Sequence, residues 1–395
     1  MANRINGTWI RISEEVYGLL QTFLKADVDC PDEAIEFSNK EDKLYFEKII
    51  EEMHRCSMLA DGKKYLEQEK SNMVIFETTN RCNLHCAHCC MSAGDLEAKE
   101  FDTNTMIQIL DKCIEWKPHF IALSGGEPLL RKDFFEILQY LRQHFSGKIG
   151  ICTNATLITE DNAGMICTNV DQLDISIDGV DEETCSLYRG KGVFKKVVNA
   201  IKLLQSKGFY NISLSMVFSD KNEILEHAFK QLNESLGTKP VYRMLAEKGR
   251  AKENKEVLAT KNYEASYVPK SFIEDMSDDT PLGASECMAG NHSILIRYNG
   301  DIYPCPSFVS YNELCMGNIC KIDDINKIVG KNMHLLIKEK LYKANRANSK
   351  ACQDCPVKLF CFSCPGDPER FSAEESFQKY CSISKPVLMN RVWGV

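Results

Sequence analysis

The sequence lacks any stretch of about 18 apolar residues free of charge, which a membrane-spanning helix would need. Its first residues lack the apolar centre of a secretory signal peptide. It also lacks a long run of lysine or arginine, and its formal net charge is -8, so no basic face for a nucleic acid is indicated. We therefore expect a cytoplasmic protein that binds neither a membrane nor a nucleic acid.

Cysteine, in contrast, is abundant, with 19 residues in a chain of 395. In a reducing cytoplasm cysteines seldom form disulfides, so we expect metal ligands, redox groups or small buried side chains. Spacing separates these possibilities, because most of the cysteines fall in two clusters. The isolated ones, which we predict to be small buried side chains, are Cys30, Cys56, Cys113, Cys152, Cys167 and Cys185.

The chain is long for a single domain, and its pattern changes twice. Residues 1–70 read as a small, charge-rich α+β domain, and residues 71–284 alternate between strands and helices. In residues 285–395 the helical period weakens, and cysteine and proline become frequent. We predict three domains with these boundaries, the last one rich in loops and held together by metal.

The middle region contains six short apolar runs separated by helical patterns. This alternation favours a parallel sheet with right-handed crossovers, and therefore an α/β fold of the β/α barrel type, whole or partial. Such sheets bind ligands at the carboxyl ends of their strands. The predicted strands are 73–76, 120–123, 149–152, 173–177, 212–217 and 241–245, and the predicted helices are 105–116, 134–144, 193–204 and 224–236.

Directly after the first predicted strand, Cys82, Cys86 and Cys89 follow the spacing C-x3-C-x2-C. Three thiolates in one loop can hold three irons of a [4Fe-4S] cluster. The fourth iron is then open to a small molecule that carries an amine and a carboxylate. A structural zinc site is the alternative, because it needs four ligands and a histidine of the loop or Cys90 could complete it.

A second motif follows the second predicted strand, where Gly125, Gly126 and Glu127 begin the next loop. Two glycines let a ligand approach the backbone closely, and Glu127 and exposed carbonyls could accept hydrogen bonds from a ligand ammonium group. On its own this tripeptide indicates only a turn. One strand–helix unit after the cysteine motif, it favours the cluster over zinc.

These motifs resemble those of the radical S-adenosylmethionine (SAM) superfamily over about residues 72–250. The resemblance implies a partial (β/α)6 radical SAM barrel, in which Cys82, Cys86 and Cys89 bind a [4Fe-4S] cluster whose open iron chelates S-adenosyl-L-methionine. The positions that resemble the cofactor-binding residues are Gly125, Gly126 and Glu127 at the amino group, Asn154, Ser176 and Asp178 near the ribose, Arg189 at the carboxylate, and His88 and Leu245 beside the adenine.

The resemblance also implies a reaction. In that superfamily an electron from the reduced cluster cleaves the cofactor sulfonium and releases a 5′-deoxyadenosyl radical, which takes a hydrogen atom from the substrate. The cofactor then carries the difficult chemistry, while the protein positions the substrate and excludes solvent. An electron donor such as flavodoxin or ferredoxin is an implied partner.

The C-terminal cysteines resemble the SPASM extension of radical SAM enzymes over about residues 285–385, which implies two auxiliary iron–sulfur clusters of the [4Fe-4S] type. Because residues 280–286 contain no cysteine, one cluster either keeps an open iron for a substrate thiolate or is completed by Cys315 or Cys320. Structural zinc is the alternative. The implied ligands are Cys352, Cys355, Cys361 and Cys381 for one cluster and Cys287, Cys305 and Cys364 for the other.

Radical SAM enzymes with this extension generally modify peptides, so the resemblance implies a ribosomal precursor peptide with a leader as substrate. We expect a maturase, similar to thioether-forming sactisynthases, that abstracts a hydrogen and forms a thioether or other crosslink. A sulfatase maturase that makes formylglycine is a second hypothesis. The missing cysteine before Cys287, and Pro306 where such enzymes often place an acid, argue against it. A metal-bound, peptide-binding protein without enzymatic activity is the third.

Residues 1–70 could recognise the leader. Residues 8–12 alternate like a strand, and helices are predicted after Ser13 and from Leu44 to Met53. A strand edge in this segment could pair with a leader peptide by β-augmentation. A simple N-terminal cap on the barrel is the alternative.

Overall fold

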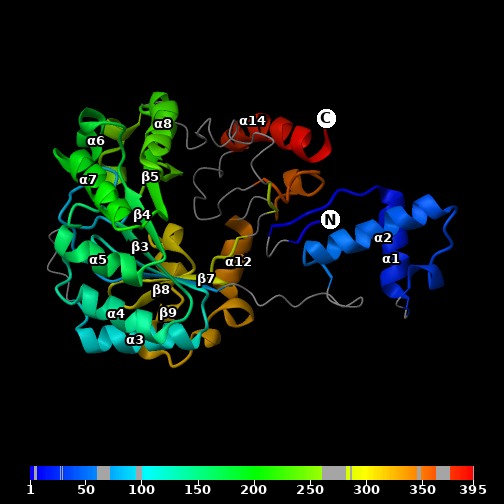
Figure 1. The fold of residues 1–395 in the computed structure, drawn as a ribbon, viewed down its shortest axis with the longest axis horizontal. Coiled ribbons are helices and arrows are strands. Elements are labelled where there is room, and N and C mark those ends of the chain that lie inside the picture. Colours follow the sequence, from blue (N-terminus) through cyan, green and yellow to red (C-terminus); the bar gives the residue numbers. More distant parts are fainter. Residues whose placement is uncertain are drawn as a thin grey trace.

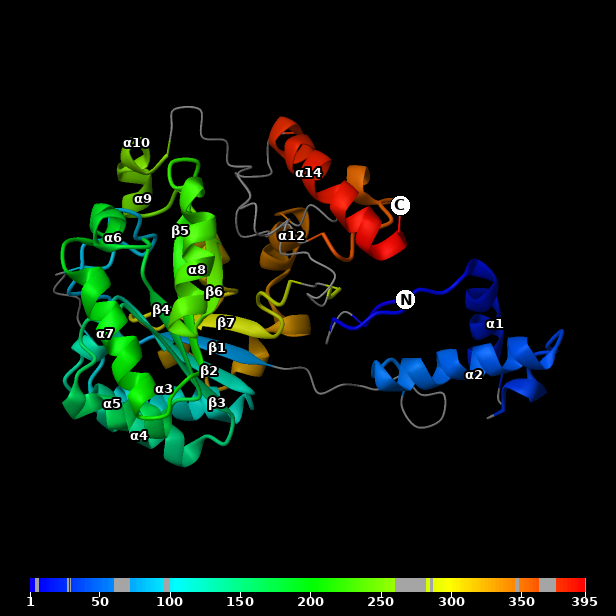
Figure 2. The same ribbon diagram turned by 45° about the horizontal axis from the view of Figure 1, so that its top comes forward.

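The computed structural model describes residues 1–3, 7–26, 28, 30–59, 72–94, 100–259, 282–284, 287–344, 348–361 and 374–394. A nine-stranded sheet lies at its centre, with helices along the outer side of the curved barrel part (Figures 1 and 2). Across the described ranges, no helix has the length and apolar character needed to cross a membrane.

The sheet has the strand order β6-β5-β4-β3-β2-β1-β7-β8-β9. Strands β1 to β6 pair in parallel with their neighbours, which confirms the predicted α/β fold built on a partial (β/α)6 barrel. The strands are β1 (Met73–Glu77), β2 (Phe120–Ser124), β3 (Lys148–Thr153), β4 (Gln172–Ser176), β5 (Ile212–Phe218), β6 (Lys239–Met244), β7 (Ser293–Ile296), β8 (Asp301–Tyr303) and β9 (Gly317–Asn318).

The helices that connect these strands bury one apolar face against the sheet. All four predicted barrel helices are confirmed, and α5 and α6 are additional. The sequence signal of α5 is weak because its buried face contains only one large apolar residue, Ile166, beside Ala163 and Asn169. The barrel helices are α3 (Thr103–Glu115), α4 (Phe134–His144), α5 (Glu160–Asn169), α6 (Glu182–Arg189), α7 (Val193–Ser206) and α8 (Glu226–Leu236), followed by the short α9 (Arg250–Glu253) and α10 (Lys255–Leu258).

The N-terminal part contains two amphipathic helices with a small core of their own, α1 (Glu14–Lys25) and α2 (Lys40–Arg55). Ser13 caps α1 by accepting a hydrogen bond from the backbone N–H of Val16, as its position before the helix predicts. The strand predicted at residues 8–12 is wrong, because only an isolated bridge between Ala2 and Trp9 forms there.

Trp9 instead packs against the C-terminal part of the chain. Its indole N–H donates to the carbonyl oxygen of Leu282 at 2.5 Å, and its ring lies edge-on to Phe360 with centroids 5.0 Å apart. In Figures 1 and 2 the N-terminal segment reaches toward α14 (Glu374–Trp393), while α1 and α2 lie to one side of the barrel. A side-chain anchor has therefore replaced the expected strand pairing.

The C-terminal part is less irregular than predicted. Strand β7 extends the barrel sheet by pairing in parallel with β1, and β8 and β9 continue it in antiparallel fashion. Helices α12 (Leu335–Ala344) and α14 are also present. Helix α14 was not predicted because it includes Pro386, a residue that normally interrupts helices.

We expect replacement of Ile121 by alanine to destabilise the barrel. Ile121 is fully buried on β2 within the main apolar core, so loss of its side chain should lower the free energy of unfolding by about 2–5 kcal/mol. Denaturant unfolding followed by circular dichroism measures the change. Ile224→Ala is the control, because this side chain is 85% exposed and its loss should cost less than about 0.5 kcal/mol. Equal shifts in the two variants would contradict the assignment of the core.

Candidate active site

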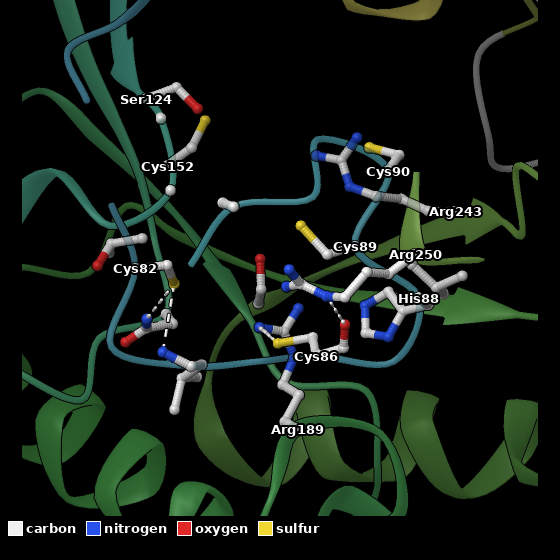
Figure 3. Close-up of a pocket in the computed structure, with 18 of the residues that line it drawn as sticks. Cys82, Cys86, His88, Cys89, Cys90, Ser124, Cys152, Arg189, Arg243 and Arg250 are labelled. Carbon is white, nitrogen blue, oxygen red and sulfur yellow. Dashed lines mark hydrogen bonds between the residues drawn. The ribbon is translucent and has the colours of Figure 1, made fainter. Parts of the chain in front are cut away.

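The three cysteines of the first motif lie in the loop after β1 and line one pocket at the carboxyl ends of the barrel strands. Figure 3 shows Cys82, Cys86 and Cys89 around a shared space. Cys82 and Cys86 are buried, and Cys89 is half-buried. Among residues that the structure describes, no three histidine, cysteine or acidic side chains lie close enough to hold a single metal ion.

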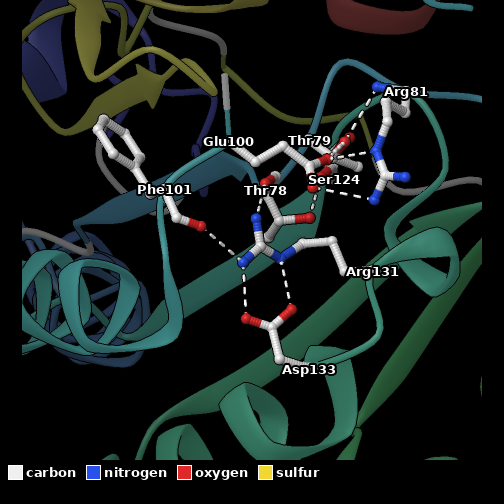
Figure 4. A network of polar contacts seen from close by, with 8 residues as sticks. All are labelled: Thr78, Thr79, Arg81, Glu100, Phe101, Ser124, Arg131 and Asp133. Atoms are coloured by element: carbon white, nitrogen blue, oxygen red, sulfur yellow. Dashed lines mark hydrogen bonds and ion pairs between the residues drawn. The ribbon is translucent and has the colours of Figure 1, made fainter. Parts of the chain in front are cut away.

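The chain that leads into this loop is fixed by polar contacts with the residues around it (Figure 4). The Arg131 guanidinium donates to the Thr78 carbonyl oxygen at 3.1 Å and pairs with Asp133 at 2.7 Å. Arg81 pairs with Glu100 at 2.8 Å. Because Arg131 is buried, its pairing with Asp133 satisfies a charge that would be costly to leave alone. These bonds restrict where the cysteine loop can start.

The glycine strip lies directly beneath the cysteine loop. A Cβ atom on Gly125 would lie 2.4 Å from the carbonyl oxygen of Thr79, and one on Gly126 would lie 2.2 Å from that of Arg81. Gly125 also has a φ of +146°, which side chains rarely adopt. Both glycines line the pocket, so their lack of a side chain brings the two loops into contact and exposes backbone to the cavity.

Glu127 lies behind the strip rather than facing the pocket. Its carboxylate is fully buried and accepts hydrogen bonds from the hydroxyl of Thr153 at 2.7 Å and from the backbone N–H groups of Asn154 and Leu129 at 2.8 and 3.1 Å. Burial raises the pKa of Glu127, although these hydrogen bonds oppose the effect. The predicted bond from Glu127 to a ligand ammonium group is therefore replaced by a role in tying β3 to the glycine strip.

Asp178 forms the buried ionic centre behind the pocket. Its carboxylate accepts hydrogen bonds at 2.5 Å from Arg189 Nε and from the Val217 backbone N–H, and it lies 2.9 Å from His88 Nε2. Burial acts to raise the pKa of Asp178, but the contacts with Arg189 and His88 outweigh it and lower the pKa below the usual range. Arg189 also donates toward Cys86 Sγ at 3.8 Å, so this ion pair holds an arginine against a predicted cluster ligand.

The other ring nitrogen of His88 also faces the pocket region. This Nδ1 atom is buried and has no hydrogen-bond partner among the described residues, and the His88 side chain lines the pocket. Because buried polar atoms are normally paired, this nitrogen fits a pocket that receives a polar ligand. Asn154 also faces the loop, donating to Asn83 at 2.9 Å and toward Cys82 Sγ at 3.8 Å.

The structure separates the predicted cofactor residues into two groups. His88, Gly125, Gly126, Asn154, Ser176 and Arg189 line the pocket. Glu127, Asp178 and Leu245 do not. Leu245 is 3% exposed and packs in an apolar cluster with Ala87 and Tyr188.

Several lining residues were not predicted. Ser124, Cys152 and Arg243 lie at the ends of β2, β3 and β6, so their place at the carboxyl ends of strands could have indicated them. Burial raises the pKa of the Cys152 thiol to about 12. Cys90 and Arg250 also line the pocket. No sequence signal indicated Arg250, because it reaches the loop from far along the chain.

The isolated cysteines follow their prediction only in part. Cys56, Cys113 and Cys185 are buried, as predicted. Cys152 and Cys167 are half-buried, and Cys30 is exposed, so the prediction is wrong for Cys30. Cys152 departs from it because its strand ends at the pocket.

The structure brings together one complete set of the C-terminal cysteines. Cys352, Cys355, Cys361 and Cys381 line a second pocket, together with apolar side chains such as Val357, Phe377 and Leu388. Burial raises the pKa of the Cys361 thiol to about 11. Cys381 reaches the others because α14 crosses over the loop that carries them.

The other predicted set is described in part. Cys287 and Cys305 both pack against one apolar cluster that includes Phe308 and Met333. Cys364 lies outside the described residues. Of the two cysteines considered for completing this set, Cys315 packs beside Tyr303 and Val309, whereas Cys320 is exposed.

Comparisons with known proteins agree with this geometry. Residues 76–232 match the model of the radical SAM superfamily, and residues 287–356 match that of SPASM, an iron–sulfur cluster-binding domain. The chain is 30% identical to the mycofactocin maturase MftC of Mycobacterium ulcerans (strain Agy99), covering 62% of this chain and 71% of the relative. It is 28% identical to the subtilosin biosynthesis protein AlbA of Bacillus subtilis (strain 168), covering 74% of this chain and 66% of the relative. The chain thus spans about two thirds of the length of these relatives.

Solved structures share the fold. The Streptococcus suis protein SuiB bound to its precursor peptide SuiA gives a TM-score of 0.58 at 15% identity, covering 90% of this chain and 85% of that one. The protein anSMEcpe with bound AdoMet gives 0.59 at 17% identity, covering 81% of this chain and 98% of that one. At these identities the likeness concerns the fold alone.

Replacing Asp178 by asparagine tests the ionic centre. Arg189 would then be buried without its counter-charge, so the free energy of unfolding should fall by about 3–5 kcal/mol. Because the pKa of Asp178 is lowered on folding, its contribution is present above the ordinary aspartate pKa of 3.8 and is lost as the pH falls below it.

Denaturant unfolding at several pH values measures both effects, and Asp178→Asn should lose less stability on acidification than the wild type. The control is Asp323→Asn, because the Asp323 side chain is 93% exposed and its replacement should change little. An unchanged stability of Asp178→Asn near neutral pH would contradict the role of this carboxylate.

Proposed function

Because the chain belongs to the radical SAM superfamily and carries a SPASM iron–sulfur region, we propose that it matures a ribosomal precursor peptide by forming a thioether or other crosslink. The observation that carries this proposal is the pocket in which Cys82, Cys86 and Cys89 meet the glycine strip of β2. The proposed division of the chain is a leader-recognition element at 1–70, a radical SAM core at 71–284 and a SPASM domain at 285–395.

The residues of the pocket fit a [4Fe-4S] cluster and S-adenosyl-L-methionine. Cys82, Cys86 and Cys89 on one loop would supply three ligands and would leave one iron for the cofactor. When bound, this pair supplies a 5′-deoxyadenosyl radical that removes a hydrogen atom from the substrate. The glycine strip offers backbone at close range, and the unpartnered Nδ1 of His88 is available to a polar group of the cofactor.

Two other pocket residues are fixed by buried carboxylates. Arg189 is held in place by Asp178, so its guanidinium can face Cys86 and a cofactor carboxylate without moving on binding. Asn154 is fixed by the N–H bond to Glu127 and lies beside Cys82. A preorganised polar wall of this kind lowers the cost of binding.

We propose two auxiliary clusters in the SPASM region. The pocket of Cys352, Cys355, Cys361 and Cys381 offers four thiols to one cluster, and its other lining residues are apolar side chains together with Lys358 and Lys385. The second cluster would use Cys287, Cys305 and Cys364. Its open iron, or Cys315 as a further ligand, would complete that site.

A peptide substrate is supported by the relatives of this chain. MftC is a mycofactocin maturase, AlbA belongs to the synthesis of a bacteriocin, and SuiB has been solved with a precursor peptide. By analogy, the helices α1 and α2 would recognise the leader of the precursor. A flavodoxin or ferredoxin would supply the electron.

A formylglycine-forming sulfatase maturase is the second candidate, and anSMEcpe, which has been solved with a bound peptide, shares the fold. Product mass separates the two: a crosslink loses two hydrogen atoms, whereas formylglycine made from cysteine also loses sulfur. Iron and acid-labile sulfide content separates both enzymes from a peptide-binding protein that holds only zinc.

Replacement of Cys82, Cys86 and Cys89 together by alanine should abolish cofactor cleavage, because the ligands of the radical cluster are removed. Replacement of Cys352 and Cys355 should spare some cleavage but lose the modified peptide. The measurement is 5′-deoxyadenosine release and peptide mass after anaerobic reconstitution with iron and sulfide, reduction, and addition of S-adenosyl-L-methionine and a candidate precursor.

Cys167→Ala is the matched control, because this half-buried cysteine lies on α5 and lines neither cysteine pocket. A wild-type chain that binds zinc and cannot split the cofactor after reconstitution would overturn the proposal.

A further inference from the structure

The segment after β6 approaches the cysteine loop more closely than side chains permit. Gly249 has a φ of +53°, and a Cβ atom there would lie 2.5 Å from the Cys90 carbonyl oxygen and 2.7 Å from that of Cys89. Alanine at this position would push the loop away. The glycine therefore allows one backbone to lie against the other at the end of the cysteine motif.

The next residues hold the loop by its carbonyl groups. The backbone N–H of Arg250 donates to the Cys89 carbonyl at 3.0 Å, and the Arg250 side-chain Nε donates to the Cys86 carbonyl at 3.0 Å. The Asn254 side-chain amide donates to the Ala87 carbonyl at 3.1 Å. One short segment thus fixes three carbonyls of the loop between the second and third cysteines.

The segment is itself well supported. Ala251, Leu258 and Ala259 are buried with Leu245 in a small apolar cluster, and Ala87 of the cysteine loop packs against that cluster. The contacts of Arg250 are therefore backed by packing from β6 and α10. They do not depend on the side chain of Arg250 alone.

Arg250 differs in charge balance from the other arginines of the pocket. Arg189 is paired with Asp178, and Arg243 is paired with Asp174. Arg250 also lines the pocket, but within the described ranges it forms no ion pair with a carboxylate. Its positive charge is therefore uncompensated beside the loop that carries Cys86 and Cys89 (Figure 3).

We propose that Arg250 is a positioning residue that clamps the cysteine loop and, through its uncompensated charge, raises the reduction potential of the cluster held there. The proposal rests on the cluster proposed at Cys82, Cys86 and Cys89. A cation near a cluster stabilises the reduced form, which carries one more negative charge. Net charge and hydrogen bonds around the ligands are known determinants of cluster potential.

The test separates charge from hydrogen bonding at one position. Arg250→Gln keeps an amide N–H but removes the charge, while Arg250→Lys keeps the charge. We expect Arg250→Gln to lower the ratio of reduced to oxidised cluster about tenfold at a fixed potential, which corresponds to a midpoint about 59 mV lower for one electron. Arg250→Lys should stay near the wild type. An anaerobic redox titration of the full chain, followed by the electron paramagnetic resonance signal of the reduced cluster, measures the midpoint.

The auxiliary clusters are removed from this measurement by working in a Cys352→Ala, Cys355→Ala, Cys305→Ala background. Lys252→Gln is the matched control, because it removes one exposed positive charge from the same short helix α9. The Lys252 variant should keep the wild-type midpoint.

Three outcomes overturn the inference: a wild-type midpoint in Arg250→Gln, an equal fall in the glutamine and lysine variants, and an equal fall in the Lys252 control. If Arg250→Gln takes up no cluster, the loaded Arg250→Lys variant decides. A midpoint about 59 mV below that of the wild type then also overturns the inference, because the lysine still carries the charge. A wild-type chain without a [4Fe-4S] signal overturns the proposed function as well, whereas a wild type that holds the cluster and splits the cofactor leaves that function standing whatever Arg250 does.

Discussion

The candidate active site depends on the fixation of one loop. A loop with three thiols is useful only if its backbone keeps them around a common space, and a free loop would lose that arrangement to conformational entropy. Here the cysteine loop is bonded on several sides. The N–H of Glu127 donates to the Arg81 carbonyl at 2.8 Å, the N–H of Ala87 donates to the Tyr188 carbonyl at 3.0 Å, and Arg250 holds the carbonyls of Cys86 and Cys89. Elements after β2, β4 and β6 thus all contribute to one loop after β1.

The buried carboxylates of the site likewise fix neighbouring groups. Asp178 and Glu127 are both fully enclosed, yet neither faces the cavity, because their oxygens bind groups that do. Asp178 fixes Arg189 and His88, and Glu127 fixes the backbone of Asn154. The carboxylates therefore act through their neighbours, and the pocket wall itself combines thiols, glycine backbone, amide and cationic groups with apolar side chains such as Leu84, Val217 and Met244.

Much of the barrel could be predicted from the sequence, because strands buried on both faces appear as continuous apolar runs and the cysteine motif is local. Strand β7 could not, because its pairing with β1 joins segments distant in sequence. The same reason applies to Arg250, whose contacts with Cys86 and Cys89 are long-range. Glu127 and Asp178 were found as site residues, but their orientation toward the protein depends on hydrogen bonds from β3 and β5 that no local pattern encodes.

The packing of Trp9 has a consequence for the order in which the protein is assembled on the ribosome. Trp9 shares an apolar cluster with Cys355 and Cys361, while the fourth thiol of their pocket, Cys381, is carried by α14. This pocket can close only after synthesis has passed α14, whereas the barrel strands around Cys82, Cys86 and Cys89 emerge much earlier.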